Sequence, residues 1–235
     1  MDLHFLGCGA AFNPDLGNTA AYWAEGDQLL LLDCGETVFS RLLSRGALQK
    51  KKQVYAAVSH LHSDHCGSLG SLALYCKFVL DAQFTLLVPD DAAYVQALRA
   101  LMGMYGVGPE DYALRPHGAL DFSAIFSLRY VPTSHAPGMP CFSFVLETPE
   151  GGVFYSADTN TAAQLLDFLQ SHGRVHRIYM EAALEDAPDS VHLSLKRLTE
   201  ALPPALYPVT RLMHLNGDAC RAAGEALGLR AARPD

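Results

Sequence analysis

Four side chains of the types that bind metal ions fall within six residues, at His60, His62, Asp64 and His65. His60 and His62 can share one ion, which leaves Asp64 and His65 for a neighbouring ion. Zinc binds imidazole nitrogen and carboxylate oxygen at roughly 2.0 to 2.2 Å, and a catalytic zinc site keeps one position open for water. Two ions about 3.5 to 4 Å apart stabilise the attacking and the leaving oxygen of a displacement. The cluster therefore predicts a two-metal hydrolytic site, in preference to a histidine-rich surface loop.

The residues on either side of this cluster predict a strand-to-helix loop. Residues 54–59 before it are apolar and partly β-branched, which is typical of a buried strand that ends at His60. Residues 67–80 after it carry apolar side chains at helical spacing and predict a helix. A loop can turn alternate side chains toward one point while the strand and the helix hold its ends.

Further polar side chains follow the ends of other predicted strands. In α/β sheets the strand ends are where functional sites form, so we expect one shared pocket. The side chains concerned are His135, Asp158, Glu181, His192 and His214. The elements expected to position them are strands over 126–133, 141–147, 152–156, 177–180 and 209–213, and a helix over 189–201 with His192 in the polar loop at its start.

The remaining elements complete an α/β pattern. They are strands over 2–6, 19–24, 28–33 and 83–88 and helices over 36–45, 90–105, 161–172 and 218–227. The glycines at 7–11 resemble a dinucleotide-binding turn, but the third glycine and the following helix are missing, so this alternative is not favoured. Residues 103–116 form the longest predicted loop, which we expect to border the substrate.

The composition is that of an ordinary globular protein. Of the 235 residues, 50% are hydrophobic and 18% are charged, which predicts one α/β domain over residues 1–235. The formal net charge of −8 disfavours non-specific binding to nucleic acid or to an anionic membrane, although a local basic patch stays compatible with it.

The sequence also indicates where the protein works. No charged segment followed by an apolar run opens the chain, and no apolar stretch approaches the roughly 20 residues that span a bilayer. We therefore expect a cytoplasmic protein without a membrane partner. Its six cysteines form no C-x-x-C pair, which predicts reduced, mostly buried thiols. Cys66 adjoins His65, and for its thiol a packing role is preferred to a role near the metal.

The pattern H-x-H-x-D-H at residues 60–65 resembles that of the metallo-β-lactamase superfamily. Further segments, in the same order along nearly the whole chain, resemble the ribonuclease Z branch. They are Phe5-Leu-Gly-Cys-Gly-Ala-Ala11, Gly17-Asn-Thr19, Leu32-Asp-Cys-Gly-Glu36, Ser59 to Gly67, Tyr155-Ser-Ala-Asp158-Thr159, Glu181-Ala-Ala183, His192-Leu-Ser194 and Met213-His214. The resemblance implies an α/β fold, a four-layer αββα metallo-β-lactamase-like sandwich, with the site at one edge of two packed sheets.

The resemblance also implies how the ligands are divided between two zinc ions. A bridging carboxylate offsets part of the repulsion between two dications and leaves room for a bridging hydroxide nucleophile, whose pKa the metals lower toward 7. Manganese or another divalent transition metal would suit the same side chains. The first ion would be held by His60, His62 and His135, the second by Asp64, His65 and His214, and both by the bridging Asp158.

Glu181 and His192 match the pair that protonates the leaving oxygen in this branch. A carboxylate that accepts one imidazole N–H fixes the ring and raises its basicity, so the other nitrogen can donate to the departing alkoxide. We therefore assign His192 as the general acid and Glu181 as the residue that orients it. Asp64, a ligand of the second ion, is counted with them as catalytic.

Simpler roles stay open for these residues. Asp158 could be the N-cap of the helix over 161–172, His135 a loop residue and His214 a core residue at a strand end. Glu181 or His192 alone could be an ordinary surface group. Structural roles are assigned to the histidines that match no motif, which are His4, His117, His172 and His176.

Departures from the family pattern limit the likeness to enzymes that process transfer RNA. Those enzymes carry a long glycine- and proline-rich arm that grips the transfer-RNA elbow, and residues 102–116 are far too short to replace it. Ala157 also stands where they have glycine. We therefore expect a dinuclear phosphodiesterase that acts on a small or nucleotide-type phosphodiester, including cyclic ones, with substrate-binding residues that the sequence does not identify.

Other functions remain as alternatives. They are ribonuclease Z activity at the 3′ end of transfer RNA, and, in a different class, a non-catalytic metal- or nucleotide-binding module. A β-lactamase is weaker, since lactam hydrolysis needs no developed acid where His192 stands. A glyoxalase-type thioesterase is weaker still, because the Glu181 and His192 motifs fit the ribonuclease Z branch better. A homodimer is implied by the resemblance alone.

Overall fold

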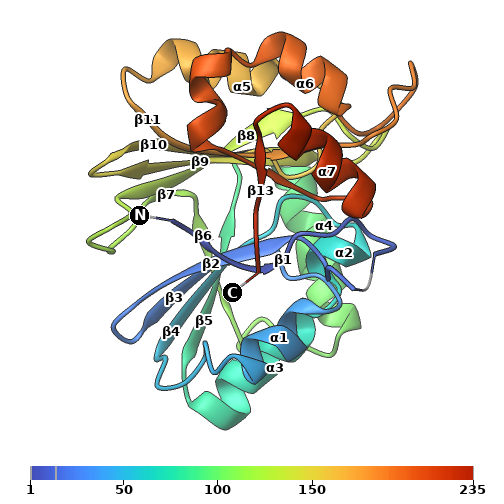
Figure 1. Ribbon diagram of the computed structural model, residues 1–235. Coiled ribbons are helices and arrows are strands. Elements are labelled where there is room, and N and C mark those ends of the chain that lie inside the picture. The colour runs from blue at the N-terminus through green and yellow to red at the C-terminus, as the bar shows by residue number, and fades with distance from the viewer. Residues whose placement is uncertain (1, 14, 235) are drawn as a thin grey trace.

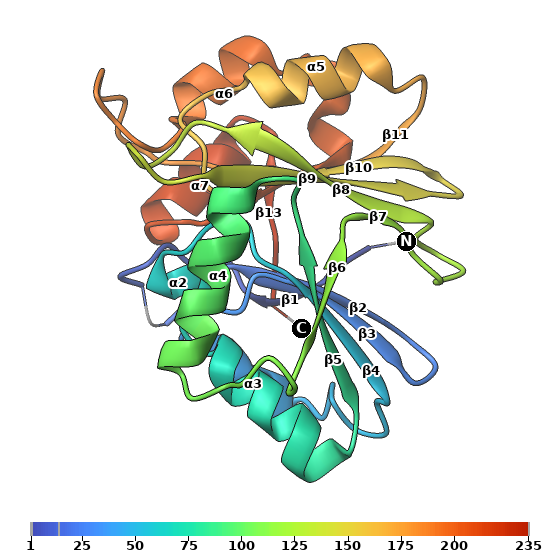
Figure 2. The ribbon, with the colours of Figure 1, turned by 180° about the vertical axis from the view of Figure 1, so that it is seen from behind.

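The computed structural model describes residues 2–13 and 15–234. Its strands form two mixed sheets that face each other, and helices lie on the outer side of each sheet (Figures 1 and 2). The layers follow the order helix, sheet, sheet, helix. The predicted fold class, an α/β protein with four αββα layers, is therefore confirmed.

The N-terminal half of the chain builds the first sheet in sequential order. Its strands are β1 (His4–Gly7), β2 (Ala20–Glu25), β3 (Gln28–Leu32), β4 (Gln53–Ala57), β5 (Gln83–Val88) and β6 (Ala113–Pro116). β1, β2 and β3 are antiparallel neighbours, as the predicted hairpin requires. β3 to β6 are parallel, which long connections between them allow.

The second sheet comes from the C-terminal half. Its spatial order is β13 (Arg230–Ala231), β12 (Thr210–Met213), β11 (Val175–Glu181), β10 (Gly151–Tyr155), β9 (Cys141–Thr148), β8 (Ser127–Thr133) and β7 (Gly118–Ala119). β10 to β13 are parallel to one another. β9 is antiparallel to both β10 and β8, so β8 points in the same direction as β10.

The helices are divided between the two outer layers. With the first sheet lie α1 (Val38–Ser44), α2 (Ser63–Cys66), α3 (Leu69–Tyr75), the π-helix η1 (Cys76–Leu80) and α4 (Ala92–Met104). With the second sheet lie α5 (Ala163–Ser171), α6 (Leu195–Ala201), the 3₁₀ helix η2 (Pro204–Val209) and α7 (Asp218–Ala226).

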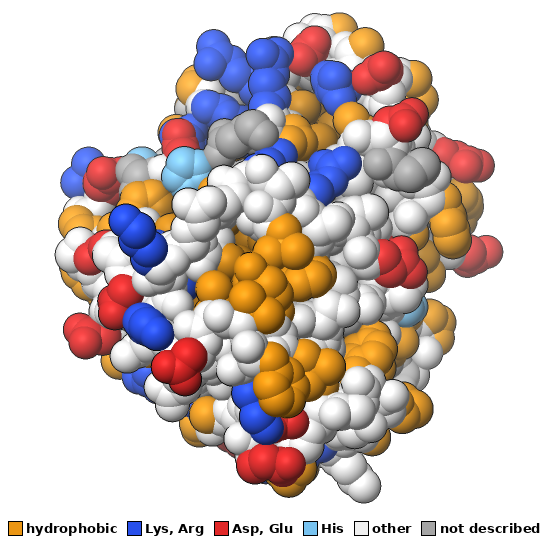
Figure 3. All heavy atoms as spheres, turned by 90° about the horizontal axis from the view of Figure 1, so that it is seen from below, with side chains coloured by type: hydrophobic (Ala, Val, Ile, Leu, Met, Phe, Trp, Pro, Cys, Tyr) orange, Lys and Arg blue, Asp and Glu red, His pale blue; other side chains and the backbone are white. Residues whose placement is uncertain are grey.

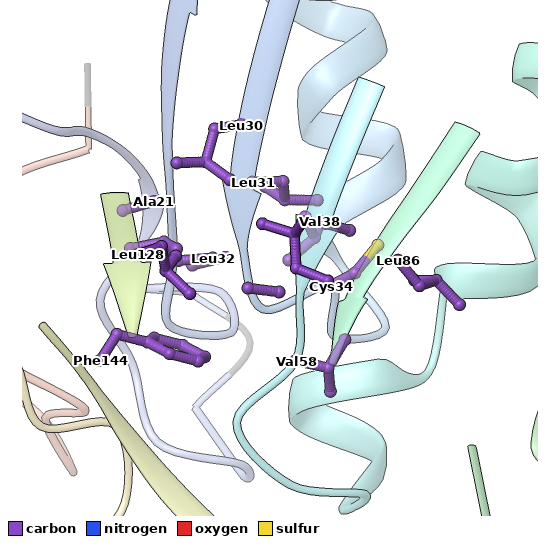
Figure 4. Close-up of a cluster of buried hydrophobic side chains, with 14 of the residues drawn as sticks. Ala21, Leu30, Leu31, Leu32, Cys34, Val38, Val58, Leu86, Leu128 and Phe144 are labelled. Atoms are coloured by element: carbon purple, nitrogen blue, oxygen red, sulfur yellow. The ribbon is translucent and has the colours of Figure 1, made fainter. Parts of the chain in front are cut away.

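β3 shows why the core lies on both sides of the first sheet. Its four leucines, 29–32, are fully buried, because one face meets the helices and the other meets the second sheet. Figure 4 shows Leu30 and Leu31 on opposite sides of β3, with Leu32 beside Leu128 and Phe144 of the second sheet. Each buried leucine contributes about 1.5 to 3 kcal/mol through removal of apolar surface from water. This packing holds the two sheets, and hence their ends, together.

The helix predicted over 189–201 begins six residues later, at Leu195. Ser194 is the reason, because its hydroxyl accepts the backbone N–H of Arg197 at 3.1 Å and so caps the helix. His192 therefore lies in the loop before the helix. The predicted helix over 67–80 is α3 followed by η1. The short strands β6, β7 and β13 were not predicted, since two to four residues carry no readable alternation.

The surface over α1, α3 and η1 carries a group of apolar side chains with charged side chains of both signs around it (Figure 3). Phe78 is 71% exposed and Val79 62% exposed on η1. A homodimer stays a prediction for this protein.

In the part of the chain that the structure describes, no helix combines the length and the apolar character needed to cross a membrane.

Candidate metal centre

The topology brings the predicted site residues to one edge of the molecule. β3 and β4 are parallel, so the segments that follow them leave the first sheet at the same end. β8, β10, β11 and β12 also share one direction, so their carboxyl ends lie together. The N–H of Phe142 donates to the carbonyl oxygen of Ser59 at 3.1 Å and joins the two edges. Every predicted ligand and both members of the predicted acid pair meet there.

The first group of ligand atoms consists of three histidine nitrogens. Nε2 of His60 lies 3.0 Å from Nδ1 of His62, which lies 3.3 Å from Nε2 of His135. Two ligands bound tetrahedrally to one zinc ion at 2.0 to 2.1 Å are roughly 3.3 to 3.4 Å apart. The spacing of the three nitrogens therefore fits one ion.

The second group combines two histidines and two carboxylates. Oδ2 of Asp64 lies 3.3 Å from Nε2 of His65 and 3.4 Å from Nε2 of His214. Oδ1 of Asp158 lies 3.2 Å from Nε2 of His65, and its Oδ2 lies 3.3 Å from Nε2 of His214. These spacings also match the edges of a metal coordination tetrahedron.

Asp158 stands between the two groups. Besides its contacts in the second group, its Oδ2 lies 3.6 Å from Nε2 of His135 and 4.0 Å from Nε2 of His60. Oδ1 of Asp158 and Nε2 of His65 are buried and have no hydrogen-bond partner among the described residues. Such buried polar atoms are costly unless a partner satisfies them, and a divalent cation would satisfy both. The side chains present therefore fit the metal ions that the sequence predicts.

Burial and neighbouring charges shift the pKa values of the side chains in the metal-free cluster. Burial, helped by the neighbouring rings, lowers the pKa of His60 well below its ordinary value. Burial disfavours charge on His65 and His214 too, but the Asp158 carboxylate outweighs it and raises both pKa values, that of His214 to about 10. Burial raises the pKa of Asp158, yet His214 and His65 hold it well below its ordinary value. Because a ligand nitrogen must be deprotonated, metal binding to the second group would release protons.

Three residues at this edge have left-handed backbone conformations. They are Asp33 with φ 64°, Ala157 with φ 48° and His214 with φ 55°. Such conformations cost about 1 kcal/mol or more for residues other than glycine and collect at functional sites. Each one follows a strand end, where it re-aims its own side chain or the next one toward the cluster.

Asp33 and Ser59 orient two of the histidines, a role that the sequence analysis missed. Nδ1–H of His65 donates to Oδ2 of Asp33 at 2.9 Å, which leaves Nε2 of His65 for a metal. Ser59 donates its N–H to Oδ1 of Asp33 at 2.7 Å and its hydroxyl to Oδ2 at 3.1 Å. The same hydroxyl accepts Nδ1–H of His60 at 3.0 Å. An aspartate directly after four leucines was the available signal for Asp33.

The substitution Asp33→Asn should weaken the second metal site. Asparagine keeps the shape and accepts a left-handed backbone, but a neutral amide no longer raises the basicity of His65. We expect metal affinity to fall roughly 10- to 100-fold, as is usual for such outer partners. Calorimetric titration of the metal-free protein with zinc measures this, with exposed Asp27→Asn as the matched control. Unchanged zinc affinity in Asp33→Asn would show that Asp33 does not support the second metal site.

Glu181 and His192 form the predicted pair. Nδ1–H of His192 donates to Oε2 of Glu181 at 2.8 Å, and Oε1 of Glu181 accepts the backbone N–H of Thr159. Burial lowers the pKa of His192, but the hydrogen bond and charge of Glu181 outweigh it, so the pKa lies above its ordinary value. Nε2 of His192 makes no hydrogen bond within the described chain, and the ring lines the cavity over the cluster. A protonated ring can therefore present a donor to that cavity.

The cavity over the cluster has a volume of about 540 Å³. Its wall adds side chains to which the sequence analysis assigned no place at the site, namely residues 10–13, Ser63, Val191 and Asn216. Nδ1–H of His135 donates to the carbonyl oxygen of Val191 at 2.8 Å, which ties the loop before α6 to the first group. Residues 103–116 do not line this cavity, so they would not border a substrate bound in it. They end α4 and form β6, which pairs with β5 at the sheet edge.

Several simpler roles can now be decided. The N-cap of α5 is Ala162 rather than Asp158. Cys66 is buried, and its thiol donates to the carbonyl oxygen of His62 at 3.1 Å, as a packing residue would. All six cysteines are free and buried, as predicted. The histidines assigned structural roles lie outside the cavity wall and the ligand groups, namely His4, His117, His172 and His176.

Comparison with known proteins identifies relatives of this chain. A family model described as "Anti-Pycsar protein Apyc1" matches residues 1–230. A protein with that name from Saccharibacillus brassicae is 31% identical over 222 residues, which cover 91% of this chain and 89% of the relative.

Solved structures share the fold. The metallo-β-lactamase fold protein YhfI from Bacillus subtilis aligns with a TM-score of 0.75 at 18% identity, over 99% of this chain and 95% of YhfI. The short form of human tRNase Z aligns with a TM-score of 0.68 at 16% identity, over 99% and 96% of the two chains. The metallo-β-lactamase-like fold that the resemblance implied is thus confirmed. At these identities the structures establish the fold alone.

Proposed function

The chain belongs to the family described as anti-Pycsar protein Apyc1, and from this premise we propose that it is a two-metal phosphodiesterase of small nucleotide phosphodiesters. A cyclic nucleotide is the substrate that we propose. The observation that carries the proposal is the position of Asp158, whose carboxylate contacts both groups of ligand atoms and lies 3.9 Å from Nδ1 of His192. Metal centre and acid thus share one cavity.

Each side chain has a defined role in this proposal. When bound, two divalent ions supply Lewis acidity at the phosphate and a nucleophile at neutral pH. Zinc is the expected ion, and manganese or another divalent transition metal would suit the same nitrogen and oxygen ligands. One ion would be held by His60, His62 and His135 and the other by Asp64, His65 and His214, with Asp158 on both.

His192 would supply the proton that phosphodiester cleavage needs. The departing sugar oxygen is a poor leaving group as an alkoxide, so a proton donor within reach lowers the barrier. Glu181 raises the pKa of His192, which favours the protonated ring, and its hydrogen bond with Nδ1 leaves Nε2 free to face the cavity. Asp64 supports the reaction as a ligand whose pKa lies below its ordinary value, because hydrogen bonds from His214 and His65 outweigh the effect of burial.

The size and charge of the molecule favour a small substrate. The cavity of about 540 Å³ is typical of small-molecule sites, which span roughly 300 to 1,000 Å³. A folded RNA needs many phosphate contacts, and each one depends on a basic side chain. The net charge of −8 disfavours such a surface, and residues 103–116 fold onto the sheet edge instead of forming an RNA-gripping arm. Processing of transfer RNA is therefore not favoured.

A substrate screen tests the proposal. Metal-loaded protein should hydrolyse bis-nitrophenyl phosphate and a 3′,5′-cyclic nucleotide, with slow or no 3′ processing of precursor transfer RNA. Metal analysis of the same sample should find close to two equivalents per chain. Assays at low and at physiological salt separate the substrates further, since RNA binding weakens steeply with salt.

Other outcomes of this screen point to the alternatives. Efficient, salt-sensitive cleavage of the precursor at its 3′ trailer would restore the ribonuclease Z function. Absence of metal after careful purification and reloading, with no hydrolysis, would favour a non-catalytic module. Turnover of lactams or thioesters in place of phosphodiesters would move the protein to another branch of the superfamily.

A further inference from the structure

One aromatic side chain stands alone at the mouth of the metal cavity. Phe12 is 100% exposed, more than any other large hydrophobic side chain in the described residues, and it lines the cavity that contains Asp64 and His214. A single exposed apolar side chain is common on protein surfaces and has no meaning by itself. The position of Phe12 at the mouth of the metal cavity, however, suggests a role in substrate binding.

Backbone hydrogen bonds fix the segment that carries this ring. Gly9 N–H donates to Gly17 O at 2.8 Å, and Asn13 N–H donates to Ala10 O at 3.0 Å, so a turn over residues 10–13 carries the ring. Ala10 N–H also donates to Leu215 O at 3.0 Å. Leu215 follows the predicted ligand His214, so the turn is attached to the metal centre. Phe12 therefore has a defined place relative to the phosphate position.

Polar groups lie beside the ring. Oδ1 of Asn13 accepts the N–H of Leu16 at 3.2 Å, while its Nδ2 has no partner among the described residues. Asn216 is exposed on the neighbouring segment and lines the same cavity. Ala11 and Val191 add apolar wall. An aromatic face with amide groups at its edge is the chemistry that recognises a nucleobase, which has a flat π-face and a polar rim.

We propose that Phe12 stacks on the nucleobase of the substrate and that Asn13 and Asn216 form the polar side of this nucleobase subsite. The inference rests on the proposed function, because it takes the phosphodiester to bind at the metal centre. Stacking on an aromatic ring tolerates every base, whereas amide contacts add modest preferences among bases. Phe12 thus acts on binding, and His192 acts on the chemical step.

The first test compares substrates with and without a base. Phe12→Ala should lower kcat/KM for a 3′,5′-cyclic nucleotide roughly 5- to 150-fold, mainly through KM, which corresponds to the loss of one stacking contact. The loss should be smaller on 1-deoxyribose 3′,5′-cyclic phosphate, which has no base. Phe12→Tyr should retain the preference for the nucleotide. Phe78→Ala, an exposed phenylalanine on η1, is the control and should leave both rates unchanged.

Equal losses on both substrates, or no loss on the nucleotide, would overturn the subsite. A binding test separates this failure from that of the proposed function. The chain has one tryptophan, Trp23 on β2, so Phe12→Trp adds a second indole at the cavity mouth. A nucleoside 5′-monophosphate should quench its fluorescence, and ribose 5-phosphate should not. Phe78→Trp is the matched control.

The two tests together distinguish failure of the nucleobase subsite from failure of the proposed function. If the wild-type protein hydrolyses no phosphodiester, the proposed function fails, and quenching specific to Phe12→Trp still supports a nucleobase subsite. If the protein hydrolyses cyclic nucleotides but Phe12→Trp is quenched equally by both phosphates or by neither, the subsite is refuted and the phosphodiesterase stands.

Discussion

Asp158→Ala is expected to lose at least one metal ion and nearly all hydrolysis while the fold persists. Asp158 belongs to the second group of ligand atoms, and its Oδ2 lies 3.6 Å from Nε2 of His135 in the first, so we expect its removal to weaken both sites and to restore the repulsion between two dications. Loss of one metal removes several kcal/mol of transition-state stabilisation, so hydrolysis should fall roughly 10³-fold or more. The sheets do not depend on this carboxylate, because the apolar residues between them lie elsewhere.

Metal analysis and activity are measured on the same preparation, with circular dichroism to follow the fold. Asp167→Ala is the matched control, since it removes an exposed aspartate from α5 and should retain metals and activity. Asp158→Asn, which keeps the shape, should also lose most activity because a neutral amide binds dications weakly. Full activity with two metals in Asp158→Ala would refute the proposed centre.

His192→Ala should keep both metals and slow turnover by roughly 10² to 10⁴, the usual contribution of a general acid. His192 belongs to neither of the two ligand sets proposed to hold the ions, and its Nδ1 is taken by Glu181. The loss should shrink for a nitrophenolate ester, whose leaving group needs little protonation. Equal losses on esters with good and poor leaving groups would contradict the assignment.

The pH dependence of turnover gives a second measure of this pair. Glu181 raises the pKa of His192 above its ordinary value, so the acid form persists to higher pH and is lost as pH rises through that raised pKa. Glu181→Gln removes the charge that raises it. The alkaline limb of the pH–rate profile should therefore move to lower pH in Glu181→Gln. An unmoved limb would show that another group sets it.

The candidate ligands could be proposed from the sequence because local pattern reveals the strands that precede them or precede the short segment that carries them. The strand before His60 is apolar and short, and the hairpin before Asp158 has a clear turn. Once strands are placed, parallel direction puts their carboxyl ends at one edge. The structure brings these side chains together at spacings that suit metal ions. Their individual roles stay proposals until metal and activity are measured.

The start of α6 and the position of residues 103–116 were misjudged for local reasons. Polar residues at 189–194 are compatible with both a helix start and a loop, and only the cap at Ser194 decides between them. Residues 103–116 look like a loop by composition, yet part of them pairs with β5 as β6. Tertiary pairing overrides local composition in such segments.

The sequence by itself determined the α/β class, the candidate ligands and the chemistry they allow, because residue types and short-range periodicity encode them, while the four-layer arrangement was implied by the resemblance. Tertiary structure alone decided which nitrogen of each histidine faces the cluster, that Asp33 orients His65, and that Phe12 stands at the cavity mouth. Asp33 and His65 are 32 positions apart, and Ala10 meets Leu215 near the other end of the chain. Contacts between such distant residues leave no periodic trace, since they arise only when the two sheets pack.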